Sequence, residues 1–299
     1  MIRAPQPAIG LSVDRGWMDL DDALLARYRA ALSAALERPA SQPTVPLGLL
    51  LSLRGEPFPT VDVEPDTVSV HGGHTLQSLA PLRVPGRYQV VGRLDDLFDK
   101  RGRSGHLTVI ARSTRWLDPS GAAVALLRDQ QIVRRIPSAA TPVSSRTPSM
   151  RAGVSTRISS APFASTPEPG DVIAVERRNA PDALAVRRYA EWITAPEPLF
   201  VDRRAAQRLG FADVIVPGPL QSALLEDLLV RALPEWSLQA LSCTFRISLV
   251  AAEAIALRVI ATEVASRADA LTLAADLTIE NTDGESAAIG DATLRRRLW

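Results

Sequence analysis

Cysteine is almost absent from this chain of 299 residues, because Cys243 is the only one. A single cysteine excludes an internal disulfide framework and fits a reducing compartment. Cys243 falls in a predicted strand, so we interpret it as a core side chain rather than a nucleophile. Lysine is equally rare, since Lys100 is the only one. Nearly all positive charge is therefore arginine, which indicates a GC-rich genome more than a binding strategy, although arginine also suits a nucleotide phosphate.

The chain also lacks a strong net charge and a long apolar run. The formal net charge of +1 argues against nucleic acid as the main partner. No apolar segment is long enough to span a bilayer, and the first residues, MIRAPQPAIG, contain no secretory apolar region. We therefore expect a cytoplasmic protein without a membrane partner. With 46% hydrophobic and 22% charged residues, the chain can build one or two packed domains.

Histidine is the third scarce residue type, and all three histidines lie in the first half of the chain. His71 and His74 are separated by two glycines and precede a predicted strand. Histidine is the usual acid-base group near neutral pH, so both are catalytic candidates, with a structural or surface role as the alternative. Two histidines without a third ligand nearby are a weak metal signal, so we expect neither a metal nor another cofactor.

A pattern that occurs twice dominates the rest of the sequence. A helical pattern covers about residues 20–37, and Val45-Pro46 opens a second apolar helix. Residues 74–135 then contain four strand-like runs separated by turn signals, and residues 243–297 repeat this plan. Two units, each with a helix covering one face of a curved sheet, predict an α+β architecture.

The segment between the two units is rich in serine, threonine, proline and alanine. It covers residues 136–170 and can bury little apolar surface, so we predict a linker. This divides the chain into an N-terminal half at residues 1–135 and a C-terminal half at residues 171–299.

The most informative stretch covers residues 188–229. We predict a strand with Arg188 and Tyr189, a proline-interrupted loop, a short helix, and a turn that opens a long apolar helix. Pro217 and Gly218 begin this last helix, and its free N–H groups suit a carbonyl oxygen or an anion. An ordinary core helix that follows a turn is the alternative.

These residues resemble the second half of the MaoC-like double-hotdog hydratases and dehydratases. The nearest types are mesaconyl-C4-CoA hydratase and 3-hydroxyacyl-thioester dehydratase. The positions that match are Arg188, Tyr189, Leu199, Asp202, Ala206, Gly210, Val216, Gly218, Pro219 and Leu220. The resemblance implies a double hotdog, in which two curved antiparallel sheets each wrap a buried helix. It also implies an acyl-CoA or acyl-carrier-protein thioester as the partner, and exposed sheet edges favour a homodimer.

The polar positions of the family motif differ in this chain. In the family, an Asp/His or Asn/His pair exchanges protons with an enoyl thioester, and backbone N–H groups hold the thioester oxygen. By this resemblance Ala195 occupies the Asp or Asn position, Glu197 the Asn or first His position, Phe200 the final His position and Pro217 the turn His position. Gly218 is retained, so the oxyanion-binding part of the site is expected to remain.

Glu197 is the remaining acidic candidate in this loop. It lies between two prolines, and an apolar cleft around it would suit acid-base chemistry, with a solvated glutamate as the alternative. The full set of candidates is Glu197, His74 and His71 as catalytic residues, and Gly218, Tyr189, Arg188 and Phe200 as substrate-binding residues. Tyr189 can donate to a substrate oxygen, although packing is the usual role of such an aromatic residue.

Two further motifs have simpler interpretations. Asp202 is favoured as the N-cap of a helix beginning at Arg203. The basic residues at 99–106 predict a hairpin that is either solvated or contacts a coenzyme A phosphate.

Three functions remain open. The first is a lyase of the hydratase or dehydratase type, in which Glu197 or a first-half histidine replaces the missing pair; it predicts a tunnel that ends at Gly218 and Glu197. The second is a catalytically degenerate acyl-binding protein or partner subunit, which predicts no polar groups around Gly218. The third is a biosynthetic dehydratase or cyclase on the same scaffold. We place the lyase first because Gly218 and its surroundings are retained.

Overall fold

The computed structural model describes residues 9–40, 45–53, 67–102, 105–135, 162–163, 165–193, 197–267 and 269–298. The first half contains β1 (Ser12–Leu20), α1 (Asp22–Leu36), α2 (Leu47–Ser52), β2 (Thr67–Ser78), β3 (Gly86–Gly102), β4 (Gly105–Leu117) and β5 (Ala123–Arg135). The second half contains β6 (Val172–Asn179), α3 (Ala183–Trp192), α4 (Pro198–Val201), α5 (Arg203–Arg208), α6 (Gly218–Ala232), β7 (Ser237–Phe245), β8 (Ala254–Arg267), β9 (Ala270–Asn281) and β10 (Ser286–Arg297).

The strands form one antiparallel sheet with the order β1-β3-β4-β5-β2-β7-β10-β9-β8-β6. From the centre outward, both halves follow the same order, so β2 corresponds to β7, β5 to β10, β4 to β9, β3 to β8 and β1 to β6. The helices correspond in the same way, with α1 matching α3 and α2 matching α6. The duplicated plan predicted from the sequence is therefore present in the structure.

The two halves are joined edge to edge along β2 and β7, which we call the seam. Residues 73–77 of β2 pair with residues 240–244 of β7. The expected pair of curved sheets is thus one continuous ten-stranded sheet. The difference arises because the two inner strands satisfy each other's backbone groups, which leaves no exposed edge in the middle of the molecule.

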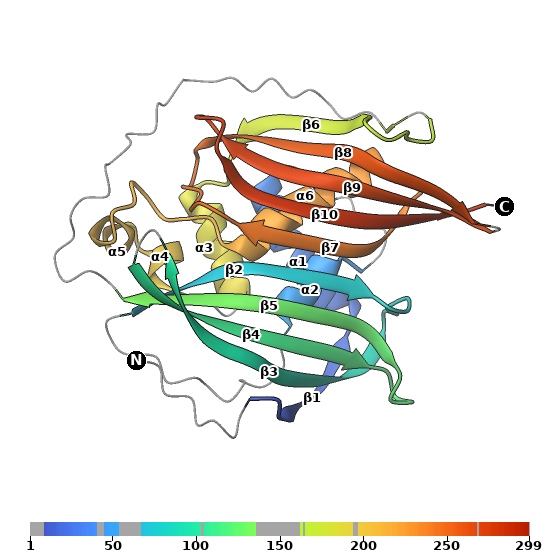
Figure 1. Cartoon of the computed structure of the whole chain (residues 1–299), viewed down its shortest axis with the longest axis horizontal. Helices are drawn as coiled ribbons and strands as arrows, with labels where there is room; N and C mark the ends of the chain where they lie inside the picture. The colour runs from blue at the N-terminus through green and yellow to red at the C-terminus, as the bar shows by residue number, and fades with distance from the viewer. Residues whose placement is uncertain are drawn as a thin grey trace.

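The helices lie on one face of this sheet (Figure 1). Helix α1 packs against α3, and α2 packs against α6. Helix α6 is buried along almost its whole length, as its leucine-rich sequence predicts. The core between helices and sheet includes the large buried side chains of Trp116, Tyr28 and Tyr189. No helix of the described residues is long and apolar enough to cross a membrane.

The prediction of a strand at Arg188 and Tyr189 is wrong, because both residues lie in helix α3. Asp182 caps this helix by accepting a hydrogen bond from the N–H of Ala185 at 2.8 Å. The buried positions of this segment recur every three to four residues, as on one face of a helix, whereas a strand would bury every second residue. They are Ala185, Val186, Tyr189 and Ala190.

Two local predictions agree with the structure. Asp202 is the N-cap of α5, and its side chain accepts from the N–H groups of Arg204 and Ala205. Strands β3 and β4 form the predicted hairpin, with Arg101 paired to His106. Most of the predicted linker, residues 136–161 and 164, lies outside the described residues.

Candidate functional site

The candidate site begins at the N-terminus of α6. Pro217 precedes the helix in an extended conformation and Pro219 lies in its first turn, so the chain enters the helix at Gly218. Among the residues that the structure describes, none accepts a hydrogen bond from the Gly218 N–H. Because α6 has 15 residues, its dipole adds to the attraction of this N–H for a negatively polarised oxygen.

A side chain at position 218 would clash with Phe245 unless the ring of Phe245 moved. A Cβ added there would lie 2.6 Å from a ring carbon of Phe245, which is closer than any normal contact. Phe245 projects from the end of β7 and covers the start of the helix. Its ring therefore forms one wall of the space in front of Gly218.

A pocket of about 240 Å³ opens at this point. Its apolar wall consists of Val70, Leu107, Ile132, Phe200, Ile215, Val216, Phe245 and Ile247. Its polar groups come from His71, Gln221, Ser248 and the two arginines Arg134 and Arg246. The pocket thus combines a short apolar space with positive charge and one histidine.

Both predicted histidines belong to a hydrogen-bonded row that runs from the pocket to α6. His71 Nε2 lies 2.9 Å from His74 Nδ1. His74 Nε2 lies 3.0 Å from the Oγ of Ser222. Ser222 is one helical turn after Gly218, and its hydroxyl donates to the Gly218 carbonyl at 3.3 Å. His74 is only 4% exposed, so the row connects the pocket to the buried interior.

A β-bulge places the two histidines on the same face of β2. Residues three apart on a regular strand face opposite sides of the sheet. The pairing of β2 with β5 shifts between His71 and Gly73, and the extra residue brings His71 back to the side of His74. Glycine is required at position 73, because a Cβ there would lie 2.7 Å from the backbone carbonyl oxygen of Cys243. At Gly72 a Cβ would lie 2.7 Å from the flexible end of the Ile132 side chain.

The structure brings together four of the seven predicted site residues. His71, Phe200 and Gly218 line the pocket, and His74 lies behind His71. Sequence reasoning missed Ser222, Phe245 and the two arginines. Ser222 had a usable signal, because it is a polar residue one turn after Gly218 in an otherwise leucine-rich helix.

The other three predicted residues lie elsewhere. Glu197 is exposed at the N-cap of α4 and does not line the pocket, so the described residues form no apolar cleft around it. Arg188 is exposed on α3, while Tyr189 is buried on the same helix. Because these two residues lie in a helix rather than in a strand beside the loop, neither lines the pocket. Ala195 lies outside the described residues.

Cys243 lies beneath the site and has the character of a core residue. Burial is the main cause that raises the pKa of its thiol to about 12. The thiol therefore stays protonated at neutral pH, which does not suit a nucleophile. Among the described residues, no group of three or more His, Cys, Asp or Glu side chains can hold a metal ion.

The corresponding position in the first half is occupied by the protein itself. Pro46 precedes α2 as Pro217 precedes α6. Glu226, from the middle of α6, accepts hydrogen bonds from the N–H of Leu47 at 2.7 Å and of Gly48 at 2.9 Å. Burial raises the pKa of Glu226 to about 7. Of these two corresponding helix starts, Glu226 fills that of α2, while a pocket lies in front of that of α6.

No family model matches the sequence, and no curated protein matches it. Solved structures do match along nearly the whole chain. A MaoC-like dehydratase is 14% identical, with a TM-score of 0.73 over 99% of this chain and 100% of its own. The chain has the fold of the MaoC-like dehydratases.

Two further structures support this assignment of the fold. A MaoC domain dehydratase of Chloroflexus aurantiacus has a TM-score of 0.66 at 14% identity, over 97% of this chain and 96% of its own. A Mycobacterium tuberculosis protein described as having a double hotdog fold has a TM-score of 0.61 at 13% identity, over 97% of this chain and 96% of its own. The MaoC-like resemblance is thus supported at the level of the hotdog fold, while the narrower hydratase and dehydratase types stay predictions.

Proposed function

We propose that this chain is a MaoC-like lyase of the hydratase or dehydratase type that acts on an acyl thioester. It would consist of two hotdog units, at residues 1–135 and 171–299, connected by the linker at 136–170. The observation that supports the proposal best is the row of His71, His74 and Ser222 beside the open N–H of Gly218. An acid-base group and an oxyanion donor in one apolar pocket are what this reaction requires.

We propose one set of proton positions for the row that is consistent with its hydrogen bonds. Ser222 donates to the Gly218 carbonyl, so its oxygen accepts from the Nε2–H of His74. A neutral His74 then has its basic nitrogen at Nδ1, which accepts from the Nε2–H of His71. In this tautomer the basic nitrogen of His71 is Nδ1. His71 thus becomes the base at the pocket, with His74 and Ser222 as positioning residues.

The proposed reaction uses these groups in a simple order. The thioester oxygen of a 3-hydroxyacyl substrate accepts from the Gly218 N–H, which stabilises the negative charge that develops when a proton leaves the α carbon. His71 takes that proton and returns it to the departing β-hydroxyl group. The products are an enoyl thioester and one water molecule, and hydration is the reverse of these steps.

The pocket also limits the substrate. Its apolar wall and its volume of about 240 Å³ fit a short acyl group. Arg134 and Arg246 favour a negative charge on the substrate or its carrier. Leu107 of the pocket follows directly after the basic β3–β4 hairpin, so the predicted contact of this hairpin with a coenzyme A phosphate is compatible with the same binding mode.

An acyl-binding protein or partner subunit without activity is the second candidate. The observation in its favour is that the proton-transfer residues of the family motif are replaced at three positions, by Ala195, Phe200 and Pro217. The polar row beside Gly218 argues against it, because a binding protein does not need an acid-base group. A biosynthetic dehydratase or cyclase would use the same row on a different carbonyl substrate.

Turnover distinguishes these candidates. We would incubate the purified protein with a panel of short enoyl- and 3-hydroxyacyl-CoA thioesters and follow the gain or loss of one water by mass spectrometry. The same samples in deuterated water report exchange of the α hydrogen. We expect both signals with at least one thioester of short chain. Tight binding of thioesters without either signal would support the binding protein, and neither binding nor turnover would favour a different carbonyl substrate.

A further inference from the structure

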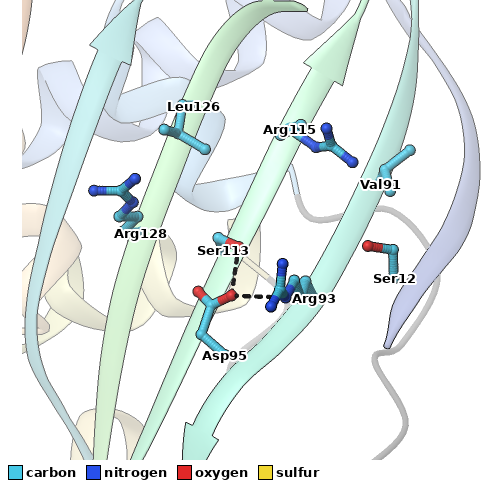
Figure 2. Close-up of a pocket in the computed structure, with 8 residues that line it drawn as sticks. All are labelled: Ser12, Val91, Arg93, Asp95, Ser113, Arg115, Leu126 and Arg128. Carbon is cyan, nitrogen blue, oxygen red and sulfur yellow. Dashed lines mark hydrogen bonds and ion pairs between the residues drawn. The ribbon is translucent and has the colours of Figure 1, made fainter. Parts of the chain in front are cut away.

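The face of the sheet opposite the helices carries an arginine patch in the first half. Arg93, Arg115 and Arg128 come from β3, β4 and β5 and surround a hollow that also contains Ser113 and Asp95 (Figure 2). Asp95 pairs with Arg93 at 3.3 Å and accepts from the Oγ of Ser113 at 3.1 Å. None of the described residues forms an ion pair with Arg115 or Arg128. The patch therefore has an excess of exposed positive charge.

The strand register extends this patch into a single row across the sheet. Neighbouring strands pair in the order Ser12, Arg93, Ser113, Arg128, Thr75, Ser242, Asp291, Asp276, Ile260 and Val172. All members face away from the helices, because the adjacent residues Leu76, Leu127, Leu241 and Ala292 are buried in the core.

The charge of the side chains in this row changes from positive to negative across the seam. Arg128 on β5 and Asp291 on β10 hold corresponding positions in the two halves, one strand away from the seam on either side. Asp276 and Asp291 are exposed and lie directly opposite each other on neighbouring strands. Two like charges directly opposite each other on neighbouring strands destabilise a sheet. No described residue forms an ion pair with either aspartate, so the described part of the chain does not relieve this repulsion.

We propose that this face binds a second copy of the chain, with the arginine patch of each copy against Asp276 and Asp291 of the other. A twofold axis that runs along the seam exchanges the two halves, so Arg128 of one copy faces Asp291 of the other, and the contact occurs twice. Face-to-face sheets lie about 10 Å apart, a distance that arginine and aspartate side chains span together. The charge complementarity of the two halves is what selects a second copy as the partner.

Sedimentation velocity of the full chain tests this interface. We expect a dimer at about 0.1 M salt that weakens at about 1 M, where the screening length falls from about 10 Å to about 3 Å. Arg128→Asp places two acidic groups opposite each other at both contacts, and Asp291→Arg places two basic groups there. Each single variant should therefore be monomeric. Arg188→Asp, on the exposed side of α3, is the matched control and should remain dimeric.

Restoring the charges makes the test specific to this pair. The double variant Arg128→Asp/Asp291→Arg should regain the dimer. An equimolar mixture of the two single variants should form a heterodimer, because both contacts then join opposite charges. The proposal would be overturned by a monomeric wild-type chain or by dimeric single variants. It would also be overturned if circular dichroism showed the double variant and the mixture to be folded and neither of them associated.

Discussion

A single inserted residue in β2 places the side chains of His71 and His74 on the same face of the sheet. The sequence identified both histidines, Gly218 and Phe200 as candidates, because residue type and motif are local features. Their convergence was not predictable, because it depends on the bulge and on packing between β2 and α6. Ser222 was missed for the same reason, since its partner His74 is 148 positions away in the chain.

The variant Ser222→Ala tests whether Ser222 orients the ring of His74 during turnover. Without the hydroxyl, His74 loses the group that orients its ring, and His71 loses its defined tautomer. We expect kcat to fall about tenfold or more, with a displaced pH profile and little change in KM. Steady-state kinetics against pH measure this, with Ser242→Ala as the control because Ser242 faces away from the site. Equal kinetics for both variants would show that the row does not act in turnover.

Gly218→Ala tests the tight contact with Phe245. The added methyl group would meet the ring, and we expect a loss of unfolding free energy of about 1–3 kcal/mol together with lower turnover. Phe245→Leu provides the relieving variant. In urea unfolding the double variant should lose less stability than the sum of the two single variants, whereas an additive result would show that the ring and the glycine do not interact.

At the scale of elements, α6 serves both halves of the molecule. Its N-terminus forms the candidate site, and its middle closes the corresponding site of the first half through Glu226. The next residue, Asp227, forms ion pairs with Arg38 and Arg231, and Arg231 also pairs with Glu176. The helix was predictable from its leucines and its prolines. The error at α3 arose because the residue pattern of 188–229 was interpreted as beginning with a strand, although the buried positions of this segment have helical spacing.

Glu226→Gln tests the buried carboxyl group through pH. The pKa of Glu226 is raised from 4.5 to about 7 in the folded protein, so its contribution to stability is complete below pH 4.5 and is lost as the pH rises through 7. Over this window the wild-type chain should lose about 3 kcal/mol relative to the variant, which cannot ionise. Urea unfolding of both proteins at both ends of the window measures the difference. A difference in stability that is constant with pH would contradict the assignment.

At the scale of the whole molecule, the two halves share one sheet and one hydrophobic core. The seam, the α1–α3 contact and the α2–α6 contact all join them. The duplication was visible in the sequence because each half repeats the same order of patterns. The continuous sheet was not visible, because the pairing of β2 with β7 depends on contacts between residues far apart in the chain.

A single cooperative unfolding transition is the expected consequence of this architecture. Neither half can expose its seam strand and its helix contacts without loss of core packing, so the halves should unfold together. Differential scanning calorimetry measures this, and the calorimetric and van't Hoff enthalpies should agree. Two separate transitions would show that the halves are independent domains.

The central claim is that proton transfer has moved from the loop of the family motif to the histidine row of β2. The most direct measurement compares kcat/KM of His71→Gln and Glu197→Gln on the best thioester of the panel, beside the wild-type chain. The account predicts that His71→Gln loses at least about a hundredfold, while exposed Glu197→Gln remains within about twofold of the wild type. If Glu197→Gln lost turnover while His71→Gln remained active, this result would contradict the account. Proton transfer would then be assigned to the loop that contains Glu197.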